Sequence, residues 1–112
     1  MKTLDQAMSD LLDAAANDYA AYCERTEYSK ETDFEEFRSS LSVEEGRKYL
    51  KVIKDDGCQR SVWGFVVKAD DHKFIAGDIL KPAGWKTPAR NAARGNVFGE
   101  YSVRWTGPNY LN

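Results

Sequence analysis

Residues 47–68, RKYLKVIKDDGCQRSVWGFVVK, contain the pattern that decides the fold. Residues 47–54 are rich in β-branched and aromatic side chains, which is typical of a strand. The dipeptide Asp56-Gly57 that follows is a signal for a hairpin turn. Residues 59–68 place apolar side chains on both faces of a second strand, which predicts a central position in a sheet. Gly64 within this strand indicates a bulge or a close contact.

Beyond the hairpin, short strand signals alternate with turns. Residues 79–81 predict a third strand and residues 100–105 predict a last one. Between them, Thr87 suits the N-cap of a helix and Gly95 suits the position just past its end. A short helix is therefore predicted over residues 88–94.

Two helices are expected before the hairpin. Each begins with a capping box, in which a threonine is followed three residues later by glutamine or glutamate (Thr3 and Gln6; Thr32 and Glu35). Apolar residues then recur at helical spacing. The first helix is expected to run to about residue 26 and the second over residues 33–41, with a further helical turn toward Gly46.

The predicted fold class is α+β: two N-terminal helices followed by an antiparallel sheet of four to five strands, with a short helix before the last strand. A chain of 112 residues is expected to form a single domain, 1–112. Residues 1–46 would be its helical acidic part, with twelve acidic and four basic side chains. Residues 47–112 would be its basic sheet part, with six acidic and twelve basic side chains. These charges either attract each other, within the fold or between subunits, or are solvated separately.

Several classes of function lack their sequence signals. We find no motif for nucleophilic catalysis, no phosphate-binding Walker loop and no zinc-ligand spacing, so we expect neither an enzyme nor a metal or cofactor. The only histidine, His72, lies in a predicted turn, where we expect it to be solvated. Cys23 and Cys58 are expected to be free thiols, although a disulfide is an alternative. No apolar run is long enough to span a membrane and no signal-peptide pattern opens the chain, which favours a cytoplasmic protein.

Residues 77–107 contain the most distinctive binding chemistry. They include two of the three tryptophans and several cations. A tryptophan in a loop can stack on a base, and an arginine can bind phosphate oxygens through two hydrogen bonds. The residues predicted to bind a ligand are Trp85, Lys86, Arg90, Arg94, Asn96 and Arg104. The alternative is that the two arginines of the predicted helix pair with the acidic helices and that the tryptophan is part of the core.

The runs GDILKPAGWKTPARNAARGN (77–96) and RWTGPNYL (104–111) resemble small tailed-phage proteins. They are similar in particular to the phage anti-Thoeris proteins, which sequester cyclic nucleotide immune signals. The resemblance implies an anti-defence protein that binds cyclic ADP-ribose isomers, or cyclic di- or trinucleotides, without cleaving them. It also implies a homo-oligomer in the host cytoplasm, with ligand pockets between subunits. It would make Trp85 the base stacker, with phosphates or ribose bound by Lys86, Arg90, Arg94, Asn96 and Arg104, and Arg25 as a further phosphate contact.

Two other functions remain open from the residues alone. The basic second half would suit a small phage protein that binds nucleic acid, for which binding should depend steeply on salt. The aromatic and charged surface would suit an inhibitor of a host protein.

Overall fold

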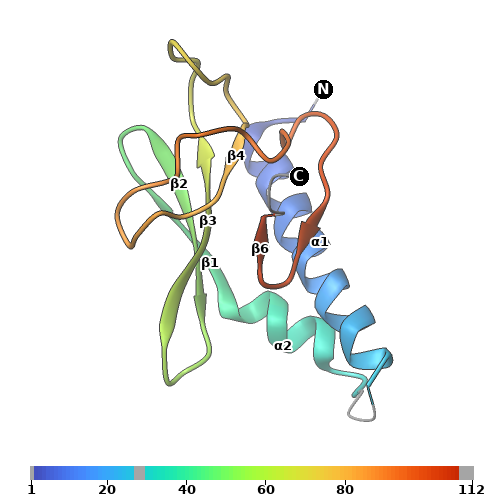
Figure 1. Cartoon of the computed structure of the whole chain (residues 1–112). Helices are drawn as coiled ribbons and strands as arrows, with labels where there is room; N and C mark the ends of the chain where they lie inside the picture. Colours follow the sequence, from blue (N-terminus) through green and yellow to red (C-terminus); the bar gives the residue numbers. More distant parts are fainter. Residues whose placement is uncertain (1, 27–29, 109–112) are drawn as a thin grey trace.

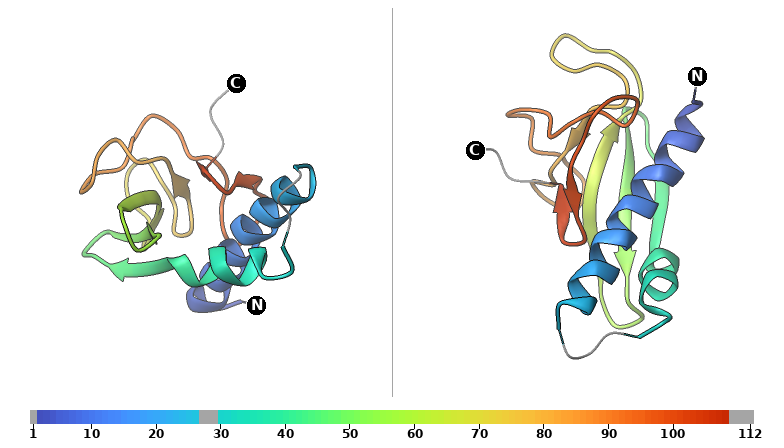
Figure 2. Two further views of the ribbon diagram at one scale, coloured as in Figure 1. Left: turned by 90° about the horizontal axis from the view of Figure 1, so that it is seen from below. Right: turned by 90° about the vertical axis from the view of Figure 1, so that its right-hand side faces the viewer.

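The computed structural model describes residues 2–26 and 30–108, and these residues form three layers (Figures 1 and 2). Two helices cover one face of an antiparallel sheet. Loops from the last third of the chain lie against the other face. The α+β class predicted from the sequence is confirmed.

Helix α1 (Leu4–Glu24) begins at the predicted capping box. The Thr3 hydroxyl accepts the Gln6 N–H at 3.2 Å, and the Gln6 side chain accepts the Thr3 N–H at 3.1 Å. The helix ends two residues before the expected position, with Arg25 as its C-cap. The side chains that it buries recur at helical spacing: Ala7, Met8, Leu11, Leu12, Ala15, Ala16 and Cys23.

Helix α2 (Asp33–Ser40) does not use the capping box predicted for it. The Thr32 side chain accepts no backbone N–H of the first turn; its hydroxyl donates instead to the Glu36 carboxylate at 3.0 Å. The Asp33 carboxylate instead accepts the N–H of Lys30 at 2.7 Å. An acidic first turn also suits the positive end of the helix dipole, so this helix is stabilised without the predicted box.

The segment after α2 corrects one prediction. Strand β1 (Leu41–Glu45) replaces the helical turn expected toward Gly46, and it pairs antiparallel with β2 (Tyr49–Asp55). The sequence signal of Ser42 followed by Glu45 is only local. Pairing with β2 gives the whole segment a ladder of backbone hydrogen bonds, which one extra turn at the end of a helix would not supply.

The sheet has four antiparallel strands in the order β1-β2-β3-β4. Strand β3 (Arg60–Val67) is central, as predicted, and the short β4 (Ile79–Leu80) is the other edge. The hairpin turn predicted at Asp56-Gly57 joins β2 to β3, and Gly57 adopts a φ of 92°.

Gly64 lies where the β2–β3 register shifts and where the C-terminal segment approaches the sheet. Val52 is opposite Gly64 but Ile53 is opposite Val62. A Cβ atom at Gly64 would lie 3.0 Å from Cγ of Pro108. Both the irregularity and the close contact expected at this glycine are therefore present.

Each face of the sheet has its own apolar cluster. On the helix side, α1 and α2 pack against Leu50, Val52, Trp63, Val66 and Ile79. On the other side, Phe65, Val67, Phe74 and Leu80 form a second cluster with Tyr49, Val62 and Ala93 against it. The second cluster is covered by the loops that precede and follow β4.

The helix predicted over residues 88–94 is not formed, and this backbone is irregular. Its amides bond to the sheet edge instead: the N–H of Ala89 donates to the Lys81 carbonyl at 2.7 Å, and that of Arg94 donates to the Ile79 carbonyl at 2.7 Å. Seven residues are too few for a helix to be stable on local bonds alone. Pairing with the exposed edge of β4 is the stronger alternative.

The last predicted strand is also shorter than expected and lies outside the sheet. Of residues 100–105, only β5 (Val103–Arg104) is a strand, and it pairs with β6 (Gly107–Pro108) as a separate hairpin. This hairpin packs between α1 and β3. The indole N–H of Trp63 donates to the Arg104 carbonyl at 3.1 Å and so ties the hairpin to the sheet.

Two glycines with the same φ of 92° allow a matched test of this packing. A Cβ at Gly57 would meet nothing within 4 Å, whereas a Cβ at Gly77 would lie 2.7 Å from both the Asn96 side chain and the Phe98 ring. We expect Gly57→Ala to cost roughly 1–2 kcal/mol of unfolding free energy through backbone strain alone. Gly77→Ala should cost about 1–3 kcal/mol more, because it also overpacks the 77–98 contact. Denaturant unfolding of both variants checks this, and equal losses would show that Gly77 is not sterically confined.

Candidate ligand-binding cleft

The seven residues predicted to bind a ligand lie in three separate places. Trp85 and Lys86 belong to a loop over the second face of the sheet. Arg90, Arg94 and Asn96 are engaged in contacts within the chain. Arg25 and Arg104 line a different hollow, at the far end of α1. Within one copy of the chain, the structure does not bring the seven residues together.

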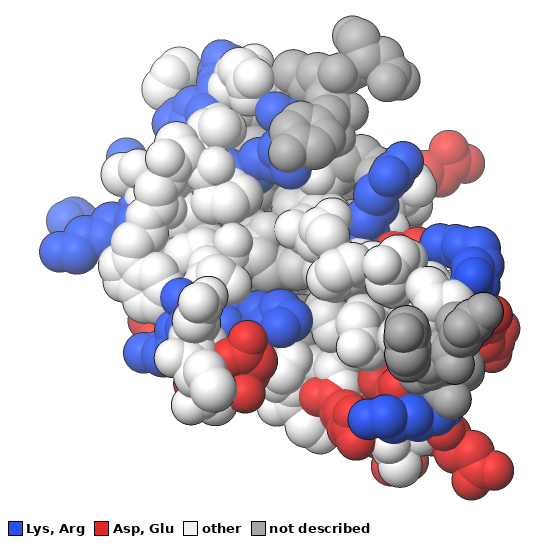
Figure 3. All heavy atoms as spheres, turned by 60° about the horizontal axis from the view of Figure 1, so that its bottom comes forward, with Lys and Arg blue, Asp and Glu red and all other residues white. Residues whose placement is uncertain are grey.

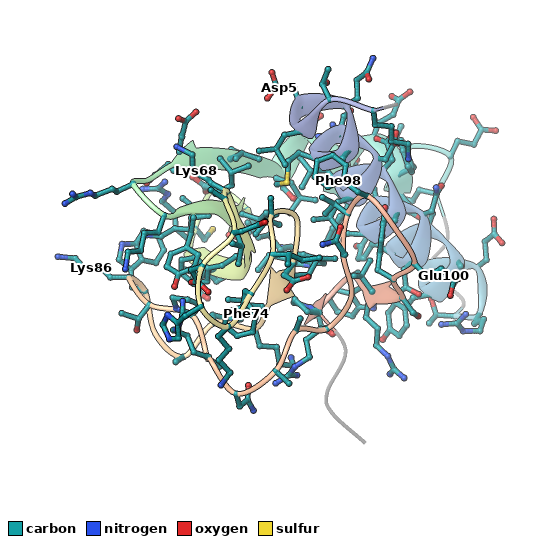
Figure 4. All side chains as sticks on the ribbon, turned by 90° about the horizontal axis from the view of Figure 1, so that it is seen from above. Asp5, Lys68, Phe74, Lys86, Phe98 and Glu100 are labelled. Atoms are coloured by element: carbon teal, nitrogen blue, oxygen red, sulfur yellow. The ribbon has the colours of Figure 1, made fainter. Side chains whose placement is uncertain are left out.

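Trp85 and Lys86 lie beside a cleft of about 380 Å³, between the β1–β2 turn and the 82–88 loop. Phe65 and Tyr49 form its apolar part, with their rings 5.9 Å apart in an edge-to-face arrangement. Lys86 stands at the outer rim of the molecule (Figure 4). The remaining lining residues come from the β1–β2 hairpin: Glu44, Glu45, Gly46, Arg47, Lys48 and Lys51.

Trp85 is held at this cleft by two cations. The Lys51 ammonium lies 4.2 Å from the centre of the indole ring and the Arg60 guanidinium lies 5.5 Å from it. Trp85 as a whole residue remains 42% exposed. A cation over an indole is attracted by about 0.5–1 kcal/mol at an exposed site, so the contact orients the ring without burying it.

The cleft is electropositive because its carboxylates are already paired. Glu44 pairs with Arg60 at 3.3 Å, and Glu45 pairs with Lys68 at 2.7 Å. The hydrogen bond from Lys68 and its charge lower the pKa of Glu45. The four cations that line the cleft, Arg47, Lys48, Lys51 and Lys86, have no ion pair among residues 2–26 and 30–108.

Arg90 supports the back of the cleft and does not line it. Its guanidinium donates to the Tyr49 hydroxyl and, at 2.9 Å, to the Asp71 carboxylate. The Asp71 carboxylate also accepts the N–H groups of Phe74 and Lys73. These two backbone bonds, followed by the bond from Arg90, hold the pKa of Asp71 well below its ordinary value. Arg90 is therefore a bridge between the 71–74 turn and β2.

Arg94 and Asn96 have structural roles in this copy of the chain. Arg94 donates to the Ala92 carbonyl at 3.2 Å and to the Asn91 side chain at 3.3 Å. The Asn96 amide donates to the Asp78 carboxylate at 3.0 Å, and its oxygen accepts the Phe98 N–H at 2.8 Å. This asparagine fixes the turn beside Gly77.

Of the nine residues that line the cleft, the sequence analysis predicts only Lys86 as a ligand-binding residue. Four of the others, Arg47, Lys48, Tyr49 and Lys51, lie at the start of a segment for which the sequence predicts only a strand. A signal was present, since Tyr49 and Lys51 alternate with the buried Leu50 and so share the face that Phe65 occupies. What the sequence did not show is that the 82–88 loop folds over that face.

No metal site or membrane span competes with this cleft in the described part of the chain. It has no group of three or more histidine, cysteine, aspartate or glutamate residues placed to hold a metal ion. None of its helices combines the length and the apolar character needed to cross a bilayer. Cys23 and Cys58 are free thiols, the first buried and the second exposed.

Over residues 1–108 the chain matches a family of unknown function, DUF7717, and it belongs to that family. No curated protein and no solved structure matches it significantly.

The Arg90–Asp71 pair predicts an acid dependence of stability. Because the folded-state pKa of Asp71 lies below its ordinary value of 3.8, its contribution is present above that pH and is lost as the pH falls below it. Asp71→Asn should therefore be less stable than the wild type at pH 7, and the difference should shrink below pH 3.8. Denaturant unfolding of both proteins at pH 7 and pH 3 measures this. If the difference in unfolding free energy between the two proteins is the same at both pH values, the charge of Asp71 does not contribute to stability.

Proposed function

We propose that the chain binds a small nucleotide in the cleft beside Trp85. The observation that carries the proposal is the exposed indole of Trp85, which contacts Arg60 and also Lys51, a lining residue of the electropositive cleft. A base can stack on such a ring with about 1–3 kcal/mol, and phosphates suit the neighbouring cations.

The cleft supports a division of roles among its residues. Trp85 offers the planar surface for a base. Lys51, Lys86, Arg47 and Lys48 line the cleft from two segments of the chain, so that the phosphates of a nucleotide would meet a cation there. The apolar floor at Phe65 and Tyr49 favours a ligand with a ring system over a bare phosphate.

The more specific form of the proposal is an anti-defence protein that sequesters cyclic nucleotide immune signals intact. Its support is the resemblance of residues 77–96 and 104–111 to phage anti-Thoeris proteins. In this form the ligand is a cyclic ADP-ribose isomer or a cyclic di- or trinucleotide, and the protein acts in the host cytoplasm. Self-association belongs to the same proposal, with the cleft completed by a second copy, and sedimentation velocity with and without ligand tests it.

Calorimetric titration with cyclic ADP-ribose isomers and cyclic dinucleotides tests the ligand class. Trp85→Ala should weaken binding by about 10- to 100-fold, which corresponds to the loss of one stacking partner. Lys51→Met removes a charge but keeps most of the side-chain stem, and it should weaken binding by about tenfold or more.

The matched control is Lys54→Met. It removes the same charge from the same strand, but Lys54 lies over Phe37 on the way to the hairpin turn and does not line the cleft. Affinity should be unchanged in this variant. Equal effects of the two lysine substitutions would indicate general electrostatics and would count against the cleft.

Recovery of the ligand separates binding from catalysis. After denaturation of the complex, chromatography should return the titrated nucleotide intact, and a cleaved product would overturn sequestration. If no nucleotide of the panel binds, and single-stranded DNA or RNA binds with an affinity that falls with salt, the alternative function in nucleic-acid binding would be favoured.

A further inference from the structure

A second hollow, distinct from the Trp85 cleft, lies where the end of α1 meets the β5–β6 hairpin. Its volume is about 500 Å³. Arg25 and Arg104, far apart in the sequence, both line it, together with Tyr22, Trp105 and Asp18. Figure 3 brings this end of the molecule forward and shows charged side chains around a mainly uncharged centre.

The backbone that carries the two arginines is fixed on both sides. The Asp18 carboxylate accepts the N–H of Trp105 at 2.9 Å, which ties the hairpin to α1. The Arg104 carbonyl accepts the indole N–H of Trp63 from the sheet. At the helix end, the N–H of Arg25 donates to the carbonyls of Ala21 and Tyr22. Because both backbones are held, bringing the two side chains to one ligand costs less conformational entropy.

The charges at this hollow are unbalanced. Within residues 2–26 and 30–108, neither the Arg25 nor the Arg104 guanidinium forms an ion pair or a hydrogen bond. Asp18 is the one carboxylate in the lining, and one of its oxygens is already used by the Trp105 amide. Two cations therefore face one partly engaged anion.

We propose that this hollow is a binding site for a phosphate group. A guanidinium can offer two parallel N–H donors to a tetrahedral oxyanion, and two guanidinium groups match its four oxygens. The hydroxyl of Thr106, in the same lining, adds a donor. The site is independent of the Trp85 cleft, because the two hollows share no lining residue.

Titration with inorganic phosphate, followed by ¹H–¹⁵N NMR at constant ionic strength, tests the site. Saturable shifts should appear at Arg25, Arg104 and Thr106. Arg104→Ala and Arg25→Ala should each weaken the binding by about tenfold or more, because a hydrogen bond to a charged group is lost. Both side chains are exposed, so the variants should fold, and retained far-UV circular dichroism will check this.

The controls separate this proposal from the proposed function. Trp85→Ala should leave the phosphate shifts at Arg25 and Arg104 unchanged, and Arg25→Ala/Arg104→Ala should leave nucleotide binding at the cleft unchanged. Lys48→Ala removes a comparable charge elsewhere and should have no effect on the shifts. A parallel titration with a short single-stranded oligonucleotide shows whether the phosphate comes from a small molecule or a polymer backbone. Shifts that are absent, that do not saturate, or that persist in the double variant would overturn the site.

Discussion

A sheet with two apolar faces and only one pair of helices is the constraint on which the rest of the structure depends. Helices α1 and α2 cover one face, where Leu50, Val52 and Trp63 lie. Phe65, Val67 and Leu80 on the other face would remain in water if nothing followed β4. Apolar area left exposed costs about 25 cal/mol per Å², so the loops that precede and follow β4, which contribute Phe74 and Ala93, are driven onto this face.

The position of the candidate site results from the way in which these loops cover the second face of the sheet. Residues 88–94 cannot form a helix and also reach the sheet edge, and the amides of Ala89 and Arg94 bond to the carbonyls of Lys81 and Ile79. The loop at residues 82–88 is thereby placed over β2 and β3, with Trp85 above Lys51 and Arg60. The cleft beside it is thus the space that remains between this loop and the β1–β2 turn. Its positive charge arises because the carboxylates of β1 are engaged by Arg60 and Lys68.

The acidic and basic halves of the sequence contribute to different layers of the structure. The acidic helices lie on one side of the sheet and the basic loops on the other, so the charge sets meet only at a few bridges. Two such bridges join β1 to residues of the basic half, Glu44 to Arg60 and Glu45 to Lys68. The Arg38–Asp13 pair lies within the acidic half and joins the two helices to each other. The alternative expected Arg90 to pair with the acidic helices, but its salt bridge is with Asp71, on its own side of the sheet.

The sequence alone was enough to predict the parts of the fold that depend on interactions between residues close together in the chain. The Thr3–Gln6 cap, the apolar stripe of the first helix and the Asp56-Gly57 turn rest on interactions over a few positions, which a pattern can show. Trp85 and Lys86 are predicted as ligand-binding residues because a tryptophan in a loop is informative without a partner, and the structure places Lys86 in the lining of the cleft. The tertiary structure alone decided three features: the strand at residues 41–45, the missing helix at 88–94, and the hollow that Arg25 and Arg104 both line. Each depends on a partner outside the segment itself, namely β2, the edge of β4 and the β5–β6 hairpin. A single sequence contains no local signal for such partners, because backbone hydrogen bonds across a sheet edge can be made by almost any side chains.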